Sequence, residues 1–172
     1  MRAALFALCL ACAAPLAAQE AEPPMTPQRM AQIVLALDPE ARPAGNGIEF
    51  QISDVLVLIV MDAGANRMRA MVPIRRSEGM TPEEILRVMQ ANFDTALDAR
   101  YAIANGQLWA VFIHPLRELE RDQLISGIGQ TVNIALTYGS LYTGGAVEFG
   151  GGDSQDLQRD LLEDLLERGQ DI

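Results

Sequence analysis

Cysteine is nearly absent from this sequence of 172 residues, and both copies, Cys9 and Cys12, lie close to its N-terminus. The remaining chain can form no disulfide, offers no thiolate nucleophile and cannot build a zinc site with cysteine ligands. A single histidine, His114, excludes a metal site made of several histidines within one chain. Because His114 precedes Pro115 at the end of an apolar run, we expect it to be a strand-end residue bonded to backbone or water.

Lysine is missing altogether, so all thirteen basic residues are arginine, and the formal net charge is −10. An acidic surface repels phosphate groups, which argues against binding to nucleic acid or to anionic lipid. Apolar residues make up 49% of the chain, enough for the core of one domain. The sequence has no nucleophile elbow, phosphate-binding glycine loop or calcium-loop spacing. We therefore predict no catalytic residues, no metal and no cofactor.

Residues 1–18 have the organisation of a cleaved secretory signal peptide. Arg2 supplies a positive start, residues 3–14 are apolar, and a pair of alanines forms a small-residue exit before the polar positions. The apolar run is too short to span a membrane. We therefore predict export to the periplasm or the medium, with a spacer over 19–25 after the signal. The alternative is a lipoprotein signal, in which Cys12 would carry the lipid.

Hydrophobic periodicity predicts an α+β domain over residues 26–142. Short connections between strands imply antiparallel pairing, so we expect a five-stranded antiparallel sheet packed on helices. The expected order is helix, three strands, helix, two strands and helix, and then a Gly-rich linker over 143–153 and an acidic amphipathic helix over 154–172. The expected helices cover about 27–37, 81–97 and 120–138, and the expected strands cover about 48–53, 55–61, 67–74 and the two arms of a hairpin over 100–115, with a loop over Pro39–Asn46.

Small residues recur at intervals of four along the helix expected over 120–138. Glycine inside a helix costs about 1 kcal/mol relative to alanine. We therefore expect this side of the helix to approach another element closely, either the sheet of the same chain or a second subunit. The stripe consists of Gly127, Thr131, Ala135 and Gly139.

The hairpin over 100–115 has the clearest turn signal in the chain. Two β-prone runs flank Asn105-Gly106, and a two-residue Asn-Gly loop is typical of a β-hairpin. This loop sets Ala102 opposite Trp109, and cross-strand partners share one face of a sheet. One face is therefore predicted to point into the core, and it carries Tyr101, Ile103, Leu108, Ala110 and Phe112.

The other face of this hairpin is too apolar to be an ordinary solvated surface. Two alternating arginines and a methionine of the strand over 67–74 should lie on the same side of the sheet. The candidate partner-binding face is therefore an apolar strip bordered by arginine, made of Trp109, Val111, Ile113, Arg100, Arg67, Arg69 and Met71. Three occupants are open: the Leu-rich tail helix, a second copy of the chain, or a peptide from an exported partner.

The element order resembles that of the type III secretion chaperone-like proteins and their YbjN-type relatives, the sensory transduction regulators. The resemblance covers roughly residues 26–142 and rests on the runs VLVLIVMDAGANRMRAMVPI, TPEEILRVMQANFDTALD and YAIANGQLWAVFIHP. It implies a protein- or peptide-binding module, often dimeric, without catalysis. The export signal departs from the secretion chaperones and argues against an effector-chaperone role in the cytoplasm.

The sequence thus predicts an exported, non-enzymatic module that binds a protein or peptide, and a homodimer is one of the expected assemblies. Two alternatives stay open. One is a periplasmic hydrolase that works with carboxylates alone, as glycosidases do, for which Asp54, Asp62, Glu78, Glu118 and Glu120 are available. The other is a structural envelope component held by a lipid on Cys12.

Overall fold

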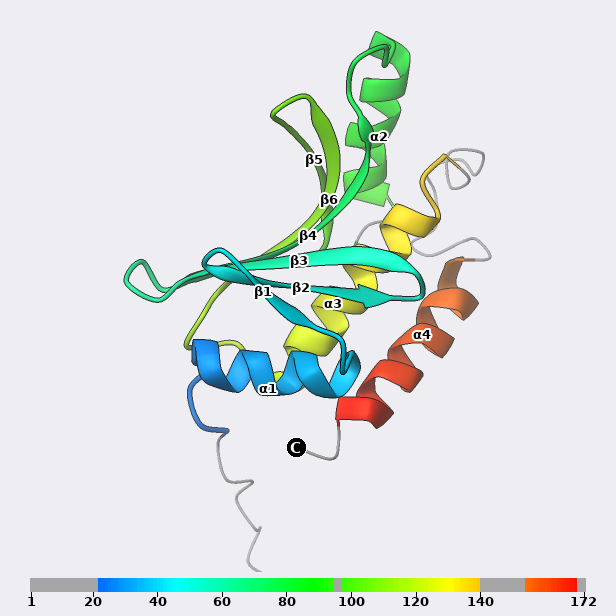
Figure 1. The fold of residues 1–172 in the computed structure, drawn as a ribbon. Helices are drawn as coiled ribbons and strands as arrows, with labels where there is room; N and C mark the ends of the chain where they lie inside the picture. The colour runs from blue at the N-terminus through cyan, green and yellow to red at the C-terminus, as the bar shows by residue number, and fades with distance from the viewer. Residues whose placement is uncertain (1–21, 95–96, 140–153, 170–172) are drawn as a thin grey trace, which may run out of the picture.

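An antiparallel sheet forms the centre of the fold and carries six strands in the order β1-β2-β3-β4-β6-β5 (Figure 1). The computed structural model describes residues 22–94, 97–139 and 154–169, and these also contain four helices. The strands are β1 (Arg42–Ala44), β2 (Gly47–Ile52), β3 (Val55–Asp62), β4 (Arg67–Arg76), β5 (Arg100–Ala104) and β6 (Gln107–Pro115), and the helices are α1 (Pro27–Leu37), α2 (Pro82–Asp94), α3 (Arg121–Leu136) and α4 (Ser154–Gly169). The predicted α+β class and antiparallel pairing are confirmed. The predicted signal peptide and Gly-rich linker lie outside the described residues.

The sheet has one strand more than the five expected from the sequence. β1 lies within the expected loop over Pro39–Asn46 and pairs with β2, where Arg42 forms an ion pair with Glu49 opposite to it. Pro43 is tolerated in this strand because β1 is at the edge of the sheet. A strand of three residues is too short to show alternation of apolar and polar positions. The prediction of a loop here was therefore wrong.

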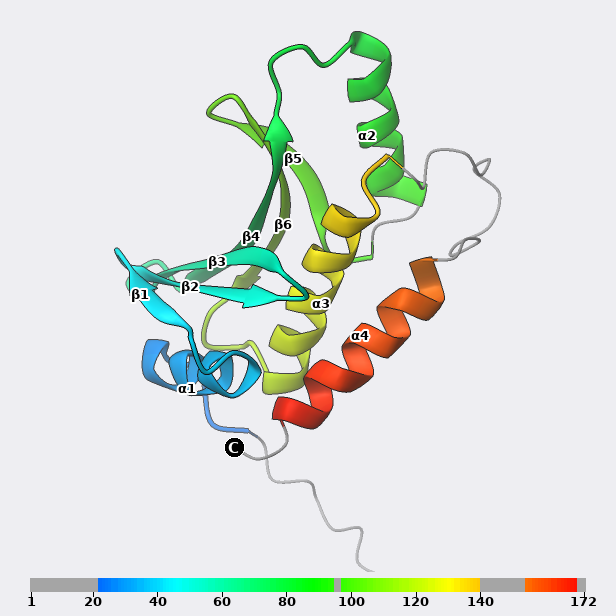
Figure 2. The same cartoon turned by 45° about the vertical axis from the view of Figure 1, so that its right-hand side comes forward.

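Helices cover one face of the sheet. α3 lies against the sheet, and α4 lies beyond α3 as a further layer (Figures 1 and 2). α1 begins after Thr26, whose Oγ accepts the N–H of Arg29 at 3.1 Å. The buried side of α1 carries Met30, Ile33, Val34 and Leu37. The opposite face of the sheet, called the outer face below, is not covered by any helix of the described residues (Figure 2). Nor is any of these helices both long and apolar enough to cross a bilayer.

α3 is buried along most of its length because it lies between the sheet and α4. Every residue from Gly127 to Ile134 is buried. Gly127 faces the sheet, and a Cβ built on it would lie 2.6 Å from ring atoms of Phe112 on β6. Of the two partners expected for the small-residue stripe, the chain's own sheet is therefore the one that approaches this glycine.

Two glycines of α3 allow a matched test of this packing. Gly127→Ala should lower the free energy of unfolding by about 1–3 kcal/mol, because the added methyl overlaps the Phe112 ring. Gly129→Ala should leave it unchanged or raise it by up to about 1 kcal/mol, since alanine is the better helix former. Its added Cβ would lie 3.5 Å from Leu165, an ordinary contact distance. Urea denaturation of both variants measures the difference, and equal effects would contradict the packing described.

α4 belongs to the same core as the rest of the domain. Leu165 is fully buried, and Gly169 lies so close to Ile125 that a Cβ on it would be 2.4 Å from the isoleucine Cδ1. Arg168 donates to the carbonyl oxygen of Leu37 at 3.0 Å, which joins α4 to the end of α1. The tail helix therefore does not occupy the outer face, and that alternative among the three predicted occupants is wrong for residues 154–169.

Candidate functional site

The β5–β6 hairpin has the register that the Asn-Gly loop predicts. Ala104 is opposite Gln107, and Ala102 is opposite Trp109. Asn105 and Gly106 have φ of 52° and 71°, the positive values that a type I′ turn requires at both positions. Trp109 therefore lies on the outer face, and its indole N–H donates to the carbonyl oxygen of Ala104 at 3.1 Å, which fixes the ring on the hairpin.

β4 and β6 bring the predicted residues together. Met71 is opposite Val111, and Arg69 is opposite Ile113, while the residues between them are buried on the α3 side. β5 then adds Arg100 opposite Val111. The structure thus places on the outer face all seven residues predicted for it: Trp109, Val111, Ile113, Arg100, Arg67, Arg69 and Met71.

A hollow of about 360 Å³ lies at the β3–β4–β6 part of the outer face. Four predicted residues line it, together with three that the sequence did not assign to the site: Val60, Asp62 and Met68. Val60 and Asp62 come from β3, where they pair with Arg69 and Arg67 of β4. Because β3 is apolar at nearly every position, periodicity alone does not tell which of its side chains point outward. The lining residues are Val60, Asp62, Arg67, Met68, Arg69, Met71 and Ile113.

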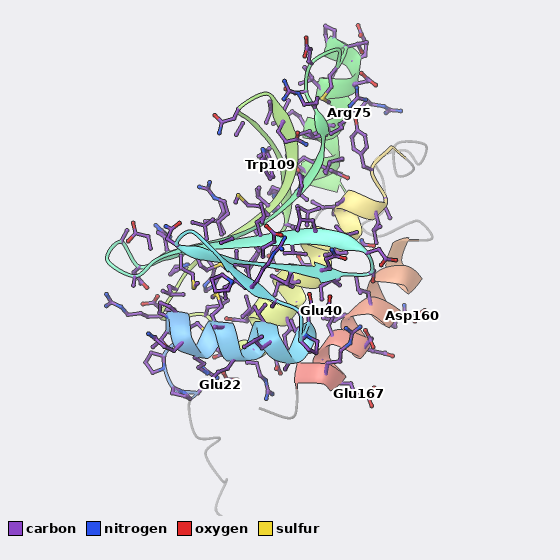
Figure 3. The ribbon with its side chains drawn as sticks, in the orientation of Figure 1. Glu22, Glu40, Arg75, Trp109, Asp160 and Glu167 are labelled. Atoms are coloured by element: carbon purple, nitrogen blue, oxygen red, sulfur yellow. The ribbon has the colours of Figure 1, made fainter. Side chains whose placement is uncertain are left out.

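Apolar side chains are exposed around this hollow. Ile113 is 52% exposed, Val60 is 36% exposed and Leu56, further along β3, is also 36% exposed. Trp109 and Val111 are half-buried. Figure 3 shows Trp109 on the hairpin, well apart from Asp160 and Glu167 of α4. The outer face is thus an open apolar surface that the described part of the chain leaves uncovered.

One core prediction for the hairpin was wrong. Ile103 shares a face with Tyr101 and Leu108, which are buried, but Ile103 itself is 47% exposed. It lies two residues before the Asn-Gly turn, at the projecting end of the hairpin (Figure 1). α3 does not reach this end, so the inner face is left without cover there. Alternation identifies the face of a residue but not whether another element packs on it.

Arginine borders the apolar surface as predicted. Arg67 and Arg69 are exposed, and within the described residues neither forms an ion pair. Arg100 differs, because its guanidinium donates to the carbonyl oxygens of Leu97 and Ala99, the latter at 2.7 Å. Arg67 and Arg69 are therefore the two cations available to an acidic group of a ligand in the hollow.

Asn92 of α2 occupies the free edge of β5. Its side-chain amide donates to the carbonyl oxygen of Tyr101 at 3.1 Å, and its amide oxygen accepts the N–H of the same residue at 2.6 Å. This pair of bonds repeats the pattern that a neighbouring strand would offer to Tyr101. Strand addition at this position of β5 is therefore blocked, and the open surface of the sheet is its outer face.

Asn92→Ala should lower the free energy of unfolding by about 1–3 kcal/mol, because two backbone groups of Tyr101 lose their partners. The loss should be local, so the amide of Tyr101 should exchange with solvent faster. Hydrogen exchange followed by NMR measures this directly. Gln90→Ala, on an exposed position of the same helix, is the control and should change neither quantity. Unchanged exchange at Tyr101 in the Asn92 variant would contradict this role.

His114 contacts the backbone at the end of β6. Its Nδ1 lies 2.8 Å from the carbonyl oxygen of Pro115, in agreement with the predicted strand-end residue bonded to backbone. Glu118 accepts a hydrogen bond from the side chain of Asn66 at 2.8 Å, and this bond holds the pKa of Glu118 below its ordinary value. Glu118 is thus an exposed carboxylate in its charged form, which is unsuited to act as a general acid near neutral pH.

Carboxylates do not converge on the outer face. Asp62 is the single acid among the residues that line the hollow, whereas glycosidase chemistry needs two carboxyl groups about 5–10 Å apart. A second, more polar hollow of about 260 Å³ includes three acids beside β1 and β2. There Asp38 accepts the N–H groups of Glu40 and Gln51 at 2.9 and 2.8 Å, and Glu49 is held in its ion pair. Among the described residues, no three His, Cys, Asp or Glu side chains come together as metal ligands.

Comparison with known proteins gives a likeness of fold and no likeness of sequence. No protein-family model matches the sequence, and no significantly similar curated protein is found. Among solved structures, the fold is similar to one chain of the HopA1-SchA chaperone-effector complex, with a TM-score of 0.50 and 8% sequence identity. The match covers 65% of this chain and 92% of that one. At this identity the likeness establishes a shared fold, which supports the chaperone-like part of the predicted resemblance.

Proposed function

We propose that this chain is an exported, non-enzymatic module that binds a protein or peptide through its outer face, as a chaperone-like or regulatory factor. The observation that carries the proposal is the open apolar surface of the sheet, with its hollow of about 360 Å³ and two arginines at the border. Soluble proteins rarely leave such a surface without a partner. The fold that the chain shares with one member of a chaperone–effector complex is in keeping with this role.

The chemistry of the surface indicates the kind of segment that would bind. Val60, Met71 and Ile113 favour an apolar side chain in the hollow. Arg67 and Arg69 favour an acidic residue next to it, since their guanidinium groups can hold a carboxylate. On a protein with a net charge of −10, these two residues bring positive charge to the outer face. The expected ligand is thus an apolar peptide segment flanked by acids.

Export is part of the proposal and rests on the composition of residues 1–18. A lipid on Cys12 would keep the same domain at the membrane surface. Mass spectrometry of the N-terminus of protein recovered from the periplasm separates the two forms. Cleavage after position 18 supports soluble export, and a diacylated Cys12 supports the anchored form.

Site-specific cross-linking in the expressing bacterium tests the binding role. A photoreactive residue at position 113 should capture a protein, whereas the same residue at position 35 of α1 should not, although Leu35 is 49% exposed. Capture at position 113 should fall at least tenfold when Arg69 is replaced by glutamate. Equal capture at the two positions, or capture that ignores the Arg69→Glu change, would overturn the assignment of the outer face.

A further inference from the structure

The outer face changes from apolar to charged along β4. Strand pairing arranges its side chains over β3, β4 and β6 in rows that run across the strands. The first row is apolar, the second has an arginine between two apolar side chains, and the third has an arginine next to an acid. The rows are Leu58, Met71 and Val111, then Val60, Arg69 and Ile113, then Asp62, Arg67 and Pro115. A ligand that fits this surface therefore has an apolar part with a negative charge at one end.

The two arginines can hold one carboxylate between them. They are two residues apart on β4, so their Cα atoms are about 6.6 Å apart and their side chains start on the same face. Arg67 and Arg69 are exposed, and no acid of the described residues forms an ion pair with either. Asp62, the acid of the third row, is held by the β3–β4 turn, because its Oδ1 accepts the N–H of Ala65 at 2.9 Å. Both guanidinium groups are thus available to a carboxylate of a ligand.

The backbone of the sheet has little to offer to a ligand on this face. β3, β4 and β6 each lie between two other strands, so their N–H and C=O groups are used within the sheet. At the edges, Asn92 closes β5 at Tyr101, and Pro43 in the middle of β1 has no N–H. Each internal residue of a peptide on the face would lose water from an N–H and a C=O without gaining a partner. A chain end brings the fewest such groups, because its last oxygens belong to a carboxylate.

We propose that the outer face binds the C-terminus of its partner, with an apolar last residue in the hollow and the terminal carboxylate held by Arg67 and Arg69. This mode of recognition rests on the proposed function and adds which part of the partner is bound. The hollow of about 360 Å³ is near the small end of the range for ligand pockets, which suits the last few residues of a chain. The order of the rows sets the direction. The partner's chain passes Met71 first and ends at Arg67, antiparallel to β4.

Synthetic peptides test the role of the carboxylate. The probe is a pool of heptapeptides whose last two positions are Leu, Ile, Val, Met or Phe, made once with a free C-terminal carboxylate and once as the C-terminal amide. The immobilised protein should retain the carboxylate peptides about tenfold more than their amides, because amidation removes the charge that the arginines bind. Retention is measured by mass spectrometry of the eluted peptides. Equal retention of the two pools, or retention of neither, would overturn the proposal.

Neutral variants separate a contact with the carboxylate from a general loss of charge. Arg67→Gln and Arg69→Gln should each lower retention of the carboxylate pool about tenfold and leave the amide pool unchanged, since only the charged end loses a partner. Arg76→Gln is the matched control, because it removes the same charge from the same strand. The Arg76 side chain is 74% exposed and lies 3.9 Å from Glu78. This control should change neither pool, and a loss equal to that of Arg69→Gln would contradict the proposal.

The cross-link at position 113 separates this proposal from the proposed function. Mass spectrometry of the digested conjugate identifies the peptide of the partner that is attached to the photoreactive residue. It should be the C-terminal peptide of the captured protein. Attachment to an internal peptide would overturn the C-terminal mode and leave the binding role of the outer face standing. Absence of any capture at position 113 would overturn both.

Discussion

Leu165→Ala should lower the free energy of unfolding by about 2–5 kcal/mol, the range for truncating a leucine in a closed core. Leu165 is fully buried, although it belongs to a helix at the surface of the domain. It packs over Gly129, one of the two glycines of α3. Removal of the Leu165 side chain should therefore detach α4 from α3. It should also weaken the contact of Gly169, one turn further along α4, with Ile125 of α3.

Urea denaturation measures the effect, with Leu161→Ala as the matched control on the same helix. Leu161 is only half-buried and should cost less than half as much. Both variants should unfold in a single transition if α4 is part of the cooperative unit. A loss below about 1 kcal/mol for Leu165→Ala would mean that α4 is a separate appendage.

Ile113→Asp should weaken partner binding at least 30-fold, which corresponds to the effect of removing a central contact of an interface. Ile113 lines the hollow and is 52% exposed, so an aspartate there remains solvated in the free protein. The free energy of unfolding should therefore change by less than about 0.5 kcal/mol. Binding is measured by calorimetry with the protein captured at position 113.

Ile103→Asp is the control for this change. Ile103 lies on the same hairpin and is similarly exposed at 47%, but it is on the opposite face. Its replacement should leave binding within a factor of two. If both variants lost binding equally, the effect would come from the hairpin as a whole and not from the outer face.

Local signals in the sequence predicted much of the fold. The Asn-Gly loop defined the hairpin register because a type I′ turn fixes which residues are opposite one another. The start of α1 near residue 27 and the stripe of small residues in α3 likewise depend on neighbours within a few positions. In each case the feature is determined by the local backbone or by one side of a single helix. The sequence pattern of that segment is therefore enough to predict it.

Features that depend on distant elements could not be predicted in this way. β1 forms because it can pair with the edge of β2. α4 packs on α3 because Gly129 of α3 leaves room for Leu165, and Gly169 of α4 leaves room for Ile125. The exposure of Ile103 reflects where α3 ends. None of these depends on a pattern within the segment itself.

The candidate site shows the same division. The sequence placed the residues of β4 and β6 on the outer face, and the structure has them there. In both strands buried and more exposed positions alternate along most of the length. Val60 and Asp62 of β3 were missed. β3 is apolar at nearly every position, so its sequence does not show which of its side chains lie on the outer face. Their place in the hollow follows from the pairing of β3 with β4, which is a long-range property.

The fluorescence of Trp109 tests the central claim most directly. Trp109 is the single tryptophan of the chain, and it lies half-buried on the outer face. Titration with the protein captured at position 113, after that partner's own tryptophans have been replaced by phenylalanine, should shift the emission of Trp109 to shorter wavelength and saturate. The shift should disappear in Arg69→Glu at the same concentrations. Binding with unchanged Trp109 emission would show that the partner occupies another surface and would contradict the account.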